Sequence, residues 1–208
     1  MKITNIKPIL TGRYLLVRVY TDAGIVGNGE SGLWAHHRTC AEMIRELSAY
    51  YIGKDPRQIE HHYQTVTRNA HFMGGVISSA LSAIDVALWD ILGKSVDLPV
   101  YQLLGGKCRD KIRVFANIGG ESIEARVSSA KQLVKEGYVS LRTNPFFGGF
   151  EQRDSTRVVT EAVNLVGAIR EGIGYDIDFG IEIHRNLQPD EAITLAKALE
   201  PFRLKYFE

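Results

Sequence analysis

The chain has 208 residues, and its 25 Lys and Arg residues against 24 Asp and Glu residues leave a formal net charge of +1. This balance argues against a nucleic-acid or membrane-surface binder, which needs a clustered excess of positive charge. Apolar residues make up 45% and charged residues 24%, the mixture of a chain that buries a core.

Neither a membrane span nor a secretory signal is expected from the sequence. The longest apolar stretch, Ala80–Leu92, is interrupted by Asp85 and Asp90 and falls short of the about 20 residues that cross a bilayer. The N-terminus lacks the apolar stretch and cleavage site of a signal peptide. Two cysteines are too few for a disulfide framework, so a cytoplasmic protein is expected.

The first half of the chain predicts a small sheet followed by helices. Residues 15–20 alternate between two faces and residues 21–24 turn the chain back, which is the pattern of a β-hairpin. Apolar residues then recur at helical spacing, first between Cys40 and Tyr51 and again between Ile77 and Leu92. This order predicts an α+β domain over residues 1–112.

After Gly106, short apolar segments and helical segments alternate, which predicts parallel strands joined by right-handed crossovers. The predicted strands cover Arg113–Ile118, Val139–Asn144, Ile177–His184 and Leu204–Phe207. The predicted helices cover about Ser122–Glu136, Ser155–Glu171 and Pro189–Leu199. A complete eight-stranded barrel needs about 250 residues. Residues 113–208 are therefore predicted to form a truncated α/β (TIM-type) barrel of about four strands and three helices.

Polar side chains are predicted to meet at the carboxyl edge of these strands. In the third strand the odd positions are apolar, so Glu182 and His184 share the opposite face. The preceding strand places Arg142 and Asn144 on the corresponding face, and Glu208 follows the last strand. This edge carries the catalytic groups of α/β barrels, so the sequence predicts a site there.

The residue types at this edge suit metal-assisted chemistry on an acid. Glu182 and Glu208, on neighbouring strands, can share a hard cation such as Mg²⁺. His184 lies two residues from one carboxylate and can move a proton near neutral pH. Any one of these residues alone is explained more simply as a solvated strand end, but the three strands together favour a site.

Three segments resemble the enolase superfamily, in its mandelate racemase/muconate lactonizing enzyme-like branch. Residues Val17–Glu30 are similar to the first hairpin of that family, Ser79–Lys94 to its signature helix, and Pro99–Gly106 to its entry into the barrel. The D-galactonate-type acid-sugar dehydratases are the most similar subgroup, through three short motifs. These motifs are Phe72–Gly75, Ala168–Glu171 and Leu199–Phe202.

The resemblance implies a hydro-lyase that uses Mg²⁺ to convert a sugar acid into a 2-keto-3-deoxy acid. It implies a capping domain over a barrel, with Glu182 and Glu208 as the first two metal ligands. After α-proton abstraction gives an enediolate, His184 would assist loss of the β-hydroxyl. The third ligand and the general base, a His in such enzymes, would follow Glu208. The 208-residue chain is therefore expected to be inactive alone, and the whole enzyme to be a homo-oligomer.

Three positions depart from the patterns of this family. Glu182 stands where the galactonate enzymes usually have Asp, and Arg185-Asn186 where they tend to have Gly-Arg. Arg142-Thr143-Asn144 stands where racemases and lactonising enzymes have a Lys pair. Arginine is a poor base, so a Lys-based racemase mechanism is disfavoured. Arg142 and Asn144 are instead predicted to bind the carboxylate or hydroxyls of the substrate, with Arg185 as a further sugar contact.

Two other functions remain open at this point. One is a sugar-acid epimerase or racemase of the same superfamily, which would invert a configuration without forming a keto acid. The other is a non-catalytic fragment that acts by association, because the outer strands of a half-barrel present unpaired edges.

Two glycine-containing motifs have simpler interpretations. Residues Gly27–Gly32 match G-x-G-x-x-G, but they close a hairpin instead of opening a βαβ unit, so a tight bend is predicted. Residues Phe146–Phe150 predict either a mobile aromatic flap over the site or a loop that packs its own aromatic rings.

Overall fold

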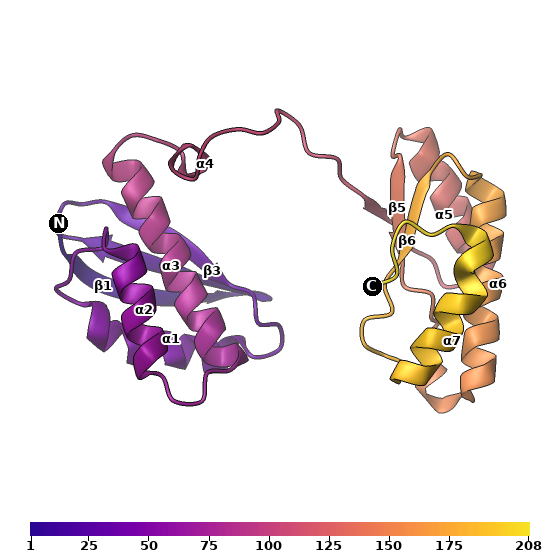
Figure 1. The fold of residues 1–208 in the computed structure, drawn as a ribbon, viewed down its shortest axis with the longest axis horizontal. Helices are drawn as coiled ribbons and strands as arrows, with labels where there is room; N and C mark the ends of the chain where they lie inside the picture. Colours follow the sequence, from indigo (N-terminus) through magenta and orange to yellow (C-terminus); the bar gives the residue numbers. More distant parts are fainter. The chain divides into compact units, whose positions relative to one another are not determined.

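Two units divide the chain in the computed structural model, which describes residues 1–208: Met1–Asp110 and Lys111–Glu208 (Figure 1). The elements of the first unit are β1 (Ile3–Thr11), β2 (Tyr14–Thr21), β3 (Val26–Ser31), α1 (His37–Tyr51), α2 (Ile59–Asn69), α3 (Gly75–Ser95) and α4 (Val100–Leu103). Those of the second are β4 (Ala116–Asn117), α5 (Ile123–Lys135), β5 (Ser140–Thr143), η1 (Phe150–Gln152), α6 (Ser155–Ile173), β6 (Asp178–Ile181), α7 (Pro189–Leu199) and η2 (Glu200–Phe202).

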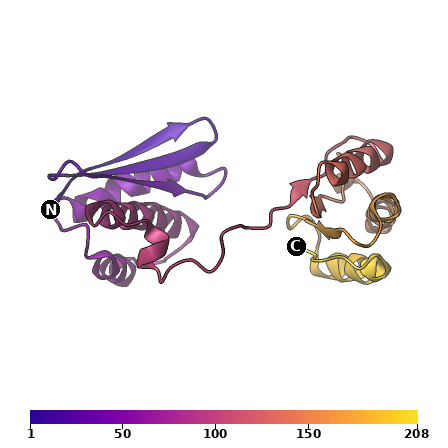
Figure 2. The same ribbon diagram turned by 90° about the horizontal axis from the view of Figure 1, so that it is seen from above.

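An antiparallel sheet in the order β1-β2-β3 forms one layer of the first unit. Figure 2 shows this sheet on one side and the helices on the other. Leu15, Val17 and Val19 are fully buried and face the helices, because alternate residues of a strand point to the same side. The predicted hairpin is found, with Gly24 at a φ of +76° in the turn between β2 and β3.

Strand β3 packs directly on the backbone of α3. A Cβ atom placed on Gly29 would lie 1.9 Å from the carbonyl oxygen of Ala83, and one on Gly27 would lie 2.1 Å from that of Ala87. The predicted tight bend is therefore wrong: both glycines of the G-x-G motif lie within β3, where they permit close contact between a strand and a helix. The helix α3 is long and apolar enough to cross a membrane by length and composition. Its buried face belongs to the core of this unit, which explains its apolar composition.

The second unit contains a parallel sheet in the order β4-β5-β6, and α5, α6 and α7 cover one of its faces (Figure 2). Leu141, Phe179 and Ile181 are fully buried between the sheet and the helices. In the register of β5 and β6, Arg142 lies beside Gly180. Because 142 and 180 have the opposite parity to the core residues, their positions belong to the face that the helices leave open.

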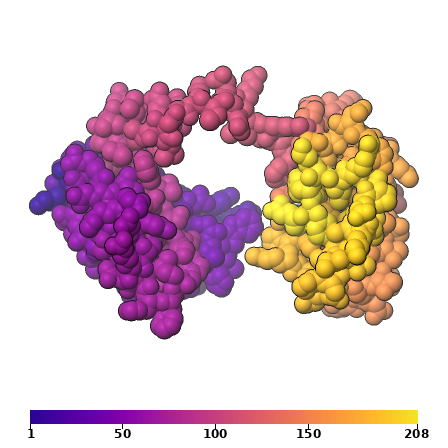
Figure 3. Space-filling view, viewed as in Figure 1, coloured from indigo at the N-terminus to yellow at the C-terminus, as the bar shows by residue number.

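The predicted helices and strands differ in how closely the structure follows them. Helices α5, α6 and α7 lie within two residues of their predicted bounds, whereas β4 is shorter than predicted and β6 ends at Ile181. The fourth predicted strand forms a single bridge, between Ile181 and Phe207. Its backbone still follows β6, since Lys205 N donates to Phe179 O at 2.7 Å and Glu208 N to Ile181 O at 3.0 Å. The yellow C-terminal residues are visible at the surface of this unit in Figure 3.

Candidate active site

The carboxyl edge of the parallel sheet brings together four of the predicted site residues. Glu182 follows β6, and its backbone N–H donates to Thr143 O of β5 at 3.0 Å. Glu208 lies level with it on the next segment, because Ile183 N donates to Glu208 O at 2.7 Å. The side chains of Glu182, Glu208, His184 and Arg142 then meet through hydrogen bonds and ion pairs.

Arg142 is the point where the two carboxylates converge. One terminal nitrogen of its guanidinium lies 2.9 Å from Glu182 Oε2 and 3.7 Å from Glu208 Oε2. Its Nε donates to Asn117 Oδ1 at 3.1 Å, and its guanidinium carbon lies 4.4 Å from the centre of the Phe115 ring. The side chain is 22% exposed, so these contacts leave little of it in solvent. Two acidic groups thus share one positive charge.

His184 reaches Glu182 through a turn. Its Nδ1 donates to Glu182 Oε1 at 2.7 Å. The strand has ended by this point, and His184 and Arg185 have φ angles of +53° and +60°. Asn186 N closes the turn on Ile183 O at 3.0 Å. Strand alternation was therefore the wrong reason for placing His184 beside Glu182, although the two side chains do meet.

The contacts of Glu182 keep its carboxyl group ionised. The hydrogen bond from His184 lowers the pKa of Glu182, and the charge of Arg142 acts in the same direction while partial burial opposes both. Glu182 therefore presents a carboxylate at neutral pH, which is the form that binds a cation or accepts a hydrogen bond.

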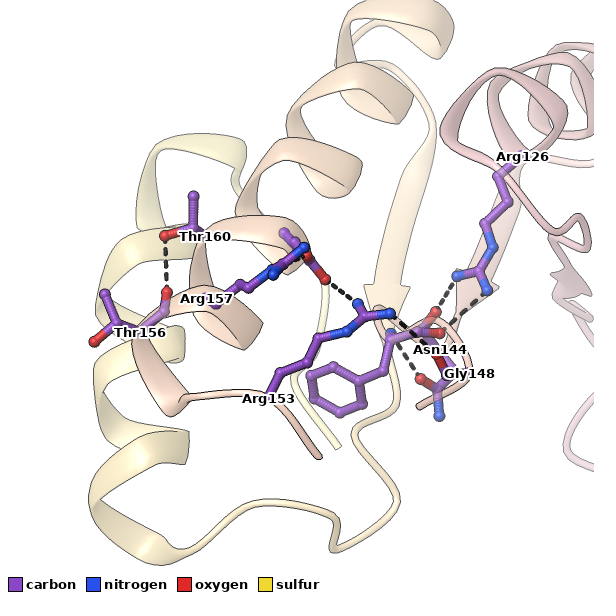
Figure 4. Close-up of polar contacts among 9 residues, drawn as sticks. Arg126, Asn144, Gly148, Arg153, Thr156, Arg157 and Thr160 are labelled. Atoms are coloured by element: carbon purple, nitrogen blue, oxygen red, sulfur yellow. Dashed lines mark hydrogen bonds and ion pairs between the residues drawn. The ribbon is translucent and has the colours of Figure 1, made fainter. Parts of the chain in front are cut away.

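The side chain of Asn144 forms a hydrogen bond within the loop that follows β5 (Figure 4). Its Oδ1 accepts a hydrogen bond from Phe146 N at 2.9 Å, and Arg126 donates to the backbone oxygens of Asn144 and Phe146. None of its hydrogen bonds goes to Arg142 or to the acidic pair. Its exposed amide NH₂ group forms no hydrogen bond within the chain, so it is the donor that remains for the predicted contact with substrate.

The aromatic residues of this loop pack against one another. Phe146 is only 7% exposed, and its ring stacks on that of Phe150 with the ring centres 4.7 Å apart. Arg153 donates to Gly148 O at 3.1 Å and pairs with Glu161 of α6, which ties the loop to a helix (Figure 4). Of the two interpretations of residues 146–150, the packed loop is the one that the structure supports.

Arg185 and Tyr206 also lie near this edge of the sheet. Arg185 is exposed and forms no hydrogen bond or ion pair with the rest of the chain. Tyr206 was missed by the sequence reasoning. Its hydroxyl is buried without a hydrogen-bond partner, and a Cβ on Gly180 would lie 2.4 Å from its Cζ. The available signal was its spacing of two from Glu208, which puts both residues on one strand face.

The acidic pair fits a hard divalent cation. Both carboxylates lie within 4 Å of a single guanidinium nitrogen, so they are close enough to share one positive ion. Mg²⁺ commonly binds through one or two carboxylates and fills its remaining positions with water and substrate oxygens. No group of three or more His, Cys, Asp or Glu side chains in the chain is placed to hold a metal ion together, so Glu182 and Glu208 would form only part of a ligand set.

Comparisons with known proteins agree with this architecture. Residues 3–105 match the family model described as mandelate racemase/muconate lactonizing enzyme, N-terminal domain, and residues 125–208 match that of the enolase C-terminal domain-like family. The D-galactonate dehydratases of Pectobacterium atrosepticum and Klebsiella pneumoniae are 39% and 38% identical over 213 residues. The match covers 100% of this chain and 55% of each relative, so the chain spans about half the length of the curated relatives it matches.

Solved structures also match almost the whole of this chain. A member of the enolase superfamily from Salmonella Typhimurium is 30% identical with a TM-score of 0.93, covering 99% of this chain and 60% of that one. An enolase from Pantoea ananatis with bound D-gluconate and Mg is 30% identical with a TM-score of 0.90, covering 99% and 59%. The chain belongs to the mandelate racemase/muconate lactonizing enzyme family of the enolase superfamily.

Proposed function

We propose that this chain supplies the capping domain and part of the active site of an Mg²⁺-dependent acid-sugar dehydratase. The observation that carries the proposal is the meeting of Glu182, Glu208 and His184 at one edge of a parallel sheet. The similarity to D-galactonate dehydratases and to an enolase with bound D-gluconate and Mg supports an aldonate as the substrate.

In this proposal Glu182 and Glu208 hold the metal ion. When bound, a divalent cation stabilises the negative charge that develops on the substrate carboxylate as the α-proton leaves. The third ligand and the base that removes this proton are assigned to parts of the enzyme beyond the residues described above. The chain would therefore contribute two ligands and the acid side of the reaction.

His184 has the geometry of a proton donor to the departing β-hydroxyl. Glu182 accepts the hydrogen bond from Nδ1, which leaves Nε2 as the ring nitrogen available to the substrate. Its side chain is 52% exposed, so a substrate can approach it. Loss of the hydroxyl as water leaves an enol, which becomes the 2-keto-3-deoxy acid. Arg142, Asn144 and Arg185 are proposed to bind the carboxylate and hydroxyls of the substrate.

The test is a panel of aldonates, including D-galactonate and D-gluconate, incubated with the purified native protein and Mg²⁺ in D₂O and followed by NMR. A 2-keto-3-deoxy acid is expected to form, and its formation should stop when the metal is chelated. His184→Asn should lower the rate by at least about 100-fold, as expected for a lost general acid. The control His61→Asn, at an exposed histidine of α2, should retain the rate.

The alternatives give different products. Inverted configuration or exchange of the α-hydrogen for deuterium, without a keto acid, would identify an epimerase or racemase and refute the dehydratase. No change in any aldonate would favour a non-catalytic role. The 208-residue chain, tested separately, is expected to be inactive.

A further inference from the structure

The groups around Arg142 form a complete binding site for its guanidinium, which is a cation that the chain itself provides. Glu182 and Glu208 supply two negative charges to one guanidinium nitrogen, at 2.9 and 3.7 Å. Asn117 accepts from Nε, and the ring of Phe115 lies 4.4 Å from the guanidinium carbon. A planar guanidinium suits this combination of carboxylates and an aromatic face, which an ammonium group would match poorly.

The same two carboxylates are the ligands assigned to the metal ion. The oxygen of Glu182 that faces Arg142 is Oε2, while Oε1 accepts from His184, so each oxygen already has one partner. A divalent ion bound by Glu182 and Glu208 would lie within a few ångströms of a permanent positive charge. Repulsion between like charges at such distances is strong in a partly buried site.

We propose that Arg142 is an internal counter-cation that a divalent metal ion must displace from Glu182 and Glu208. This inference rests on the proposed function, because it concerns the same carboxylates. Without metal, Arg142 offsets one of the two negative charges of the acidic pair and holds the side chains of Glu182 and Glu208 together. On metal binding the guanidinium leaves the pair and becomes available to an anion, for which the carboxylate of an acid substrate is the fitting partner. Arg142 thereby sets the metal affinity of the site.

The test measures metal binding directly. Mn²⁺ is titrated into the purified native protein and the free ion is followed by electron paramagnetic resonance, with Mg²⁺ as competitor. Arg142→Gln should bind Mn²⁺ about tenfold more tightly than the native chain, because a repelling charge has been removed. Arg142→Lys, which keeps the charge, should bind less tightly than Arg142→Gln. Glu182→Gln should abolish the site.

A matched control separates this effect from a change in net charge. Arg113 pairs with Asp178 at 3.0 Å, at the start of β6 rather than at its carboxyl edge. Arg113→Gln removes the same charge and should leave the Mn²⁺ affinity unchanged. Far-ultraviolet circular dichroism shows whether each variant is folded. A second readout is the Tm, which Mg²⁺ should raise more in Arg142→Gln than in the native chain.

The outcomes distinguish the inference from the proposed function. Equal Mn²⁺ affinity in the native chain and Arg142→Gln, lost in Glu182→Gln, would overturn the role of Arg142 and leave the metal site intact. Weaker binding by Arg142→Gln would also overturn it, since Arg142 would then support the ligands. Absence of binding in all variants, Arg142→Gln included, would refute both the inference and the assigned metal ligands.

Discussion

His184 and Arg185 show how a single turn shapes this edge of the sheet. Both have positive φ angles, a region that costs a non-glycine residue about 1 kcal/mol or more. Alternation along the strand placed Glu182 correctly. The turn could not be predicted, because neither glycine nor asparagine marks its two central positions. Tyr206 was missed for a related reason, since its significance depends on Gly180 being small enough to lie beneath its ring.

Replacing Arg185 by glycine should relieve backbone strain. Arg185→Gly is expected to raise the free energy of unfolding by about 0.5–1 kcal/mol, because the gain in the turn exceeds the added entropy of the unfolded chain. Urea denaturation measures this value. Arg109→Gly, at an exposed arginine without a positive φ, should give no increase. A loss of stability in Arg185→Gly would show that the side chain, rather than the backbone, decides the energy of this turn.

His62 should make the stability of the first unit depend on pH. It is 1% exposed, contacts Tyr50 through Nδ1 and Asp55 O through Nε2, and burial lowers its pKa from 6.5. Above pH 6.5 it is neutral both folded and unfolded. As the pH falls below 6.5, the unfolded state binds the proton first, so stability decreases until the folded pKa is passed.

The comparison with His62→Gln isolates this effect. Urea denaturation between pH 7.5 and about pH 5, a range that includes the ordinary histidine pKa of 6.5, should show a steeper loss of stability in the native chain than in His62→Gln. His61→Gln, at the exposed neighbouring position, should retain the native slope. Parallel slopes for all three proteins would contradict the assignment to His62.

At the scale of elements, helices were predicted more accurately than strands because their signals are local. Ser122 accepts a hydrogen bond from Ala125 N at 3.1 Å at the start of α5, and Gln188 forms a capping box with Glu191 at the start of α7. Such caps are visible in the sequence. The length of a strand depends on its partner, and β4 has only β5 beside it, so only two of its residues form a regular ladder.

The packing of β3 on α3 gives a strong prediction. Gly29→Ala should lower the free energy of unfolding by more than about 2 kcal/mol, because the new methyl group would overlap the backbone of Ala83 and force the strand and helix apart. Denaturation followed by circular dichroism provides the measurement. Gly32→Ala is the control, since a Cβ there meets no atom within 4 Å. Equal stability of the two variants would contradict the close packing.

At the scale of the whole molecule, the two units have separate hydrophobic cores. Near Gly106 the sequence changes from a helix-rich pattern to alternating strands and helices, and this change predicted two domains. The family was predicted from the resemblance of three segments of the chain to the enolase superfamily. The sequence alone could not show that Arg142 faces both carboxylates, because this depends on the register of β5 with β6 and on the path of the last segment. Such relations between strands arise from tertiary pairing and have no local signature.

Separate cores should produce separate responses. Gly29→Ala is expected to lower the free energy of unfolding of the first unit alone. Mg²⁺ is expected to raise the free energy of unfolding of the second unit alone. Hydrogen exchange resolved along the chain measures both effects in one sample. Changes spread equally over Met1–Asp110 and Lys111–Glu208 would show that the two units unfold together.

The most direct test of the account is a crystal structure of the protein grown with Mn²⁺ and examined by anomalous scattering. One anomalous peak is expected at about 2.0–2.3 Å from an oxygen of each of Glu182 and Glu208, with the guanidinium of Arg142 moved away from both. No peak between these carboxylates, together with an intact pair between Arg142 and Glu182, would contradict the assignment of the metal site and the proposed dehydratase chemistry.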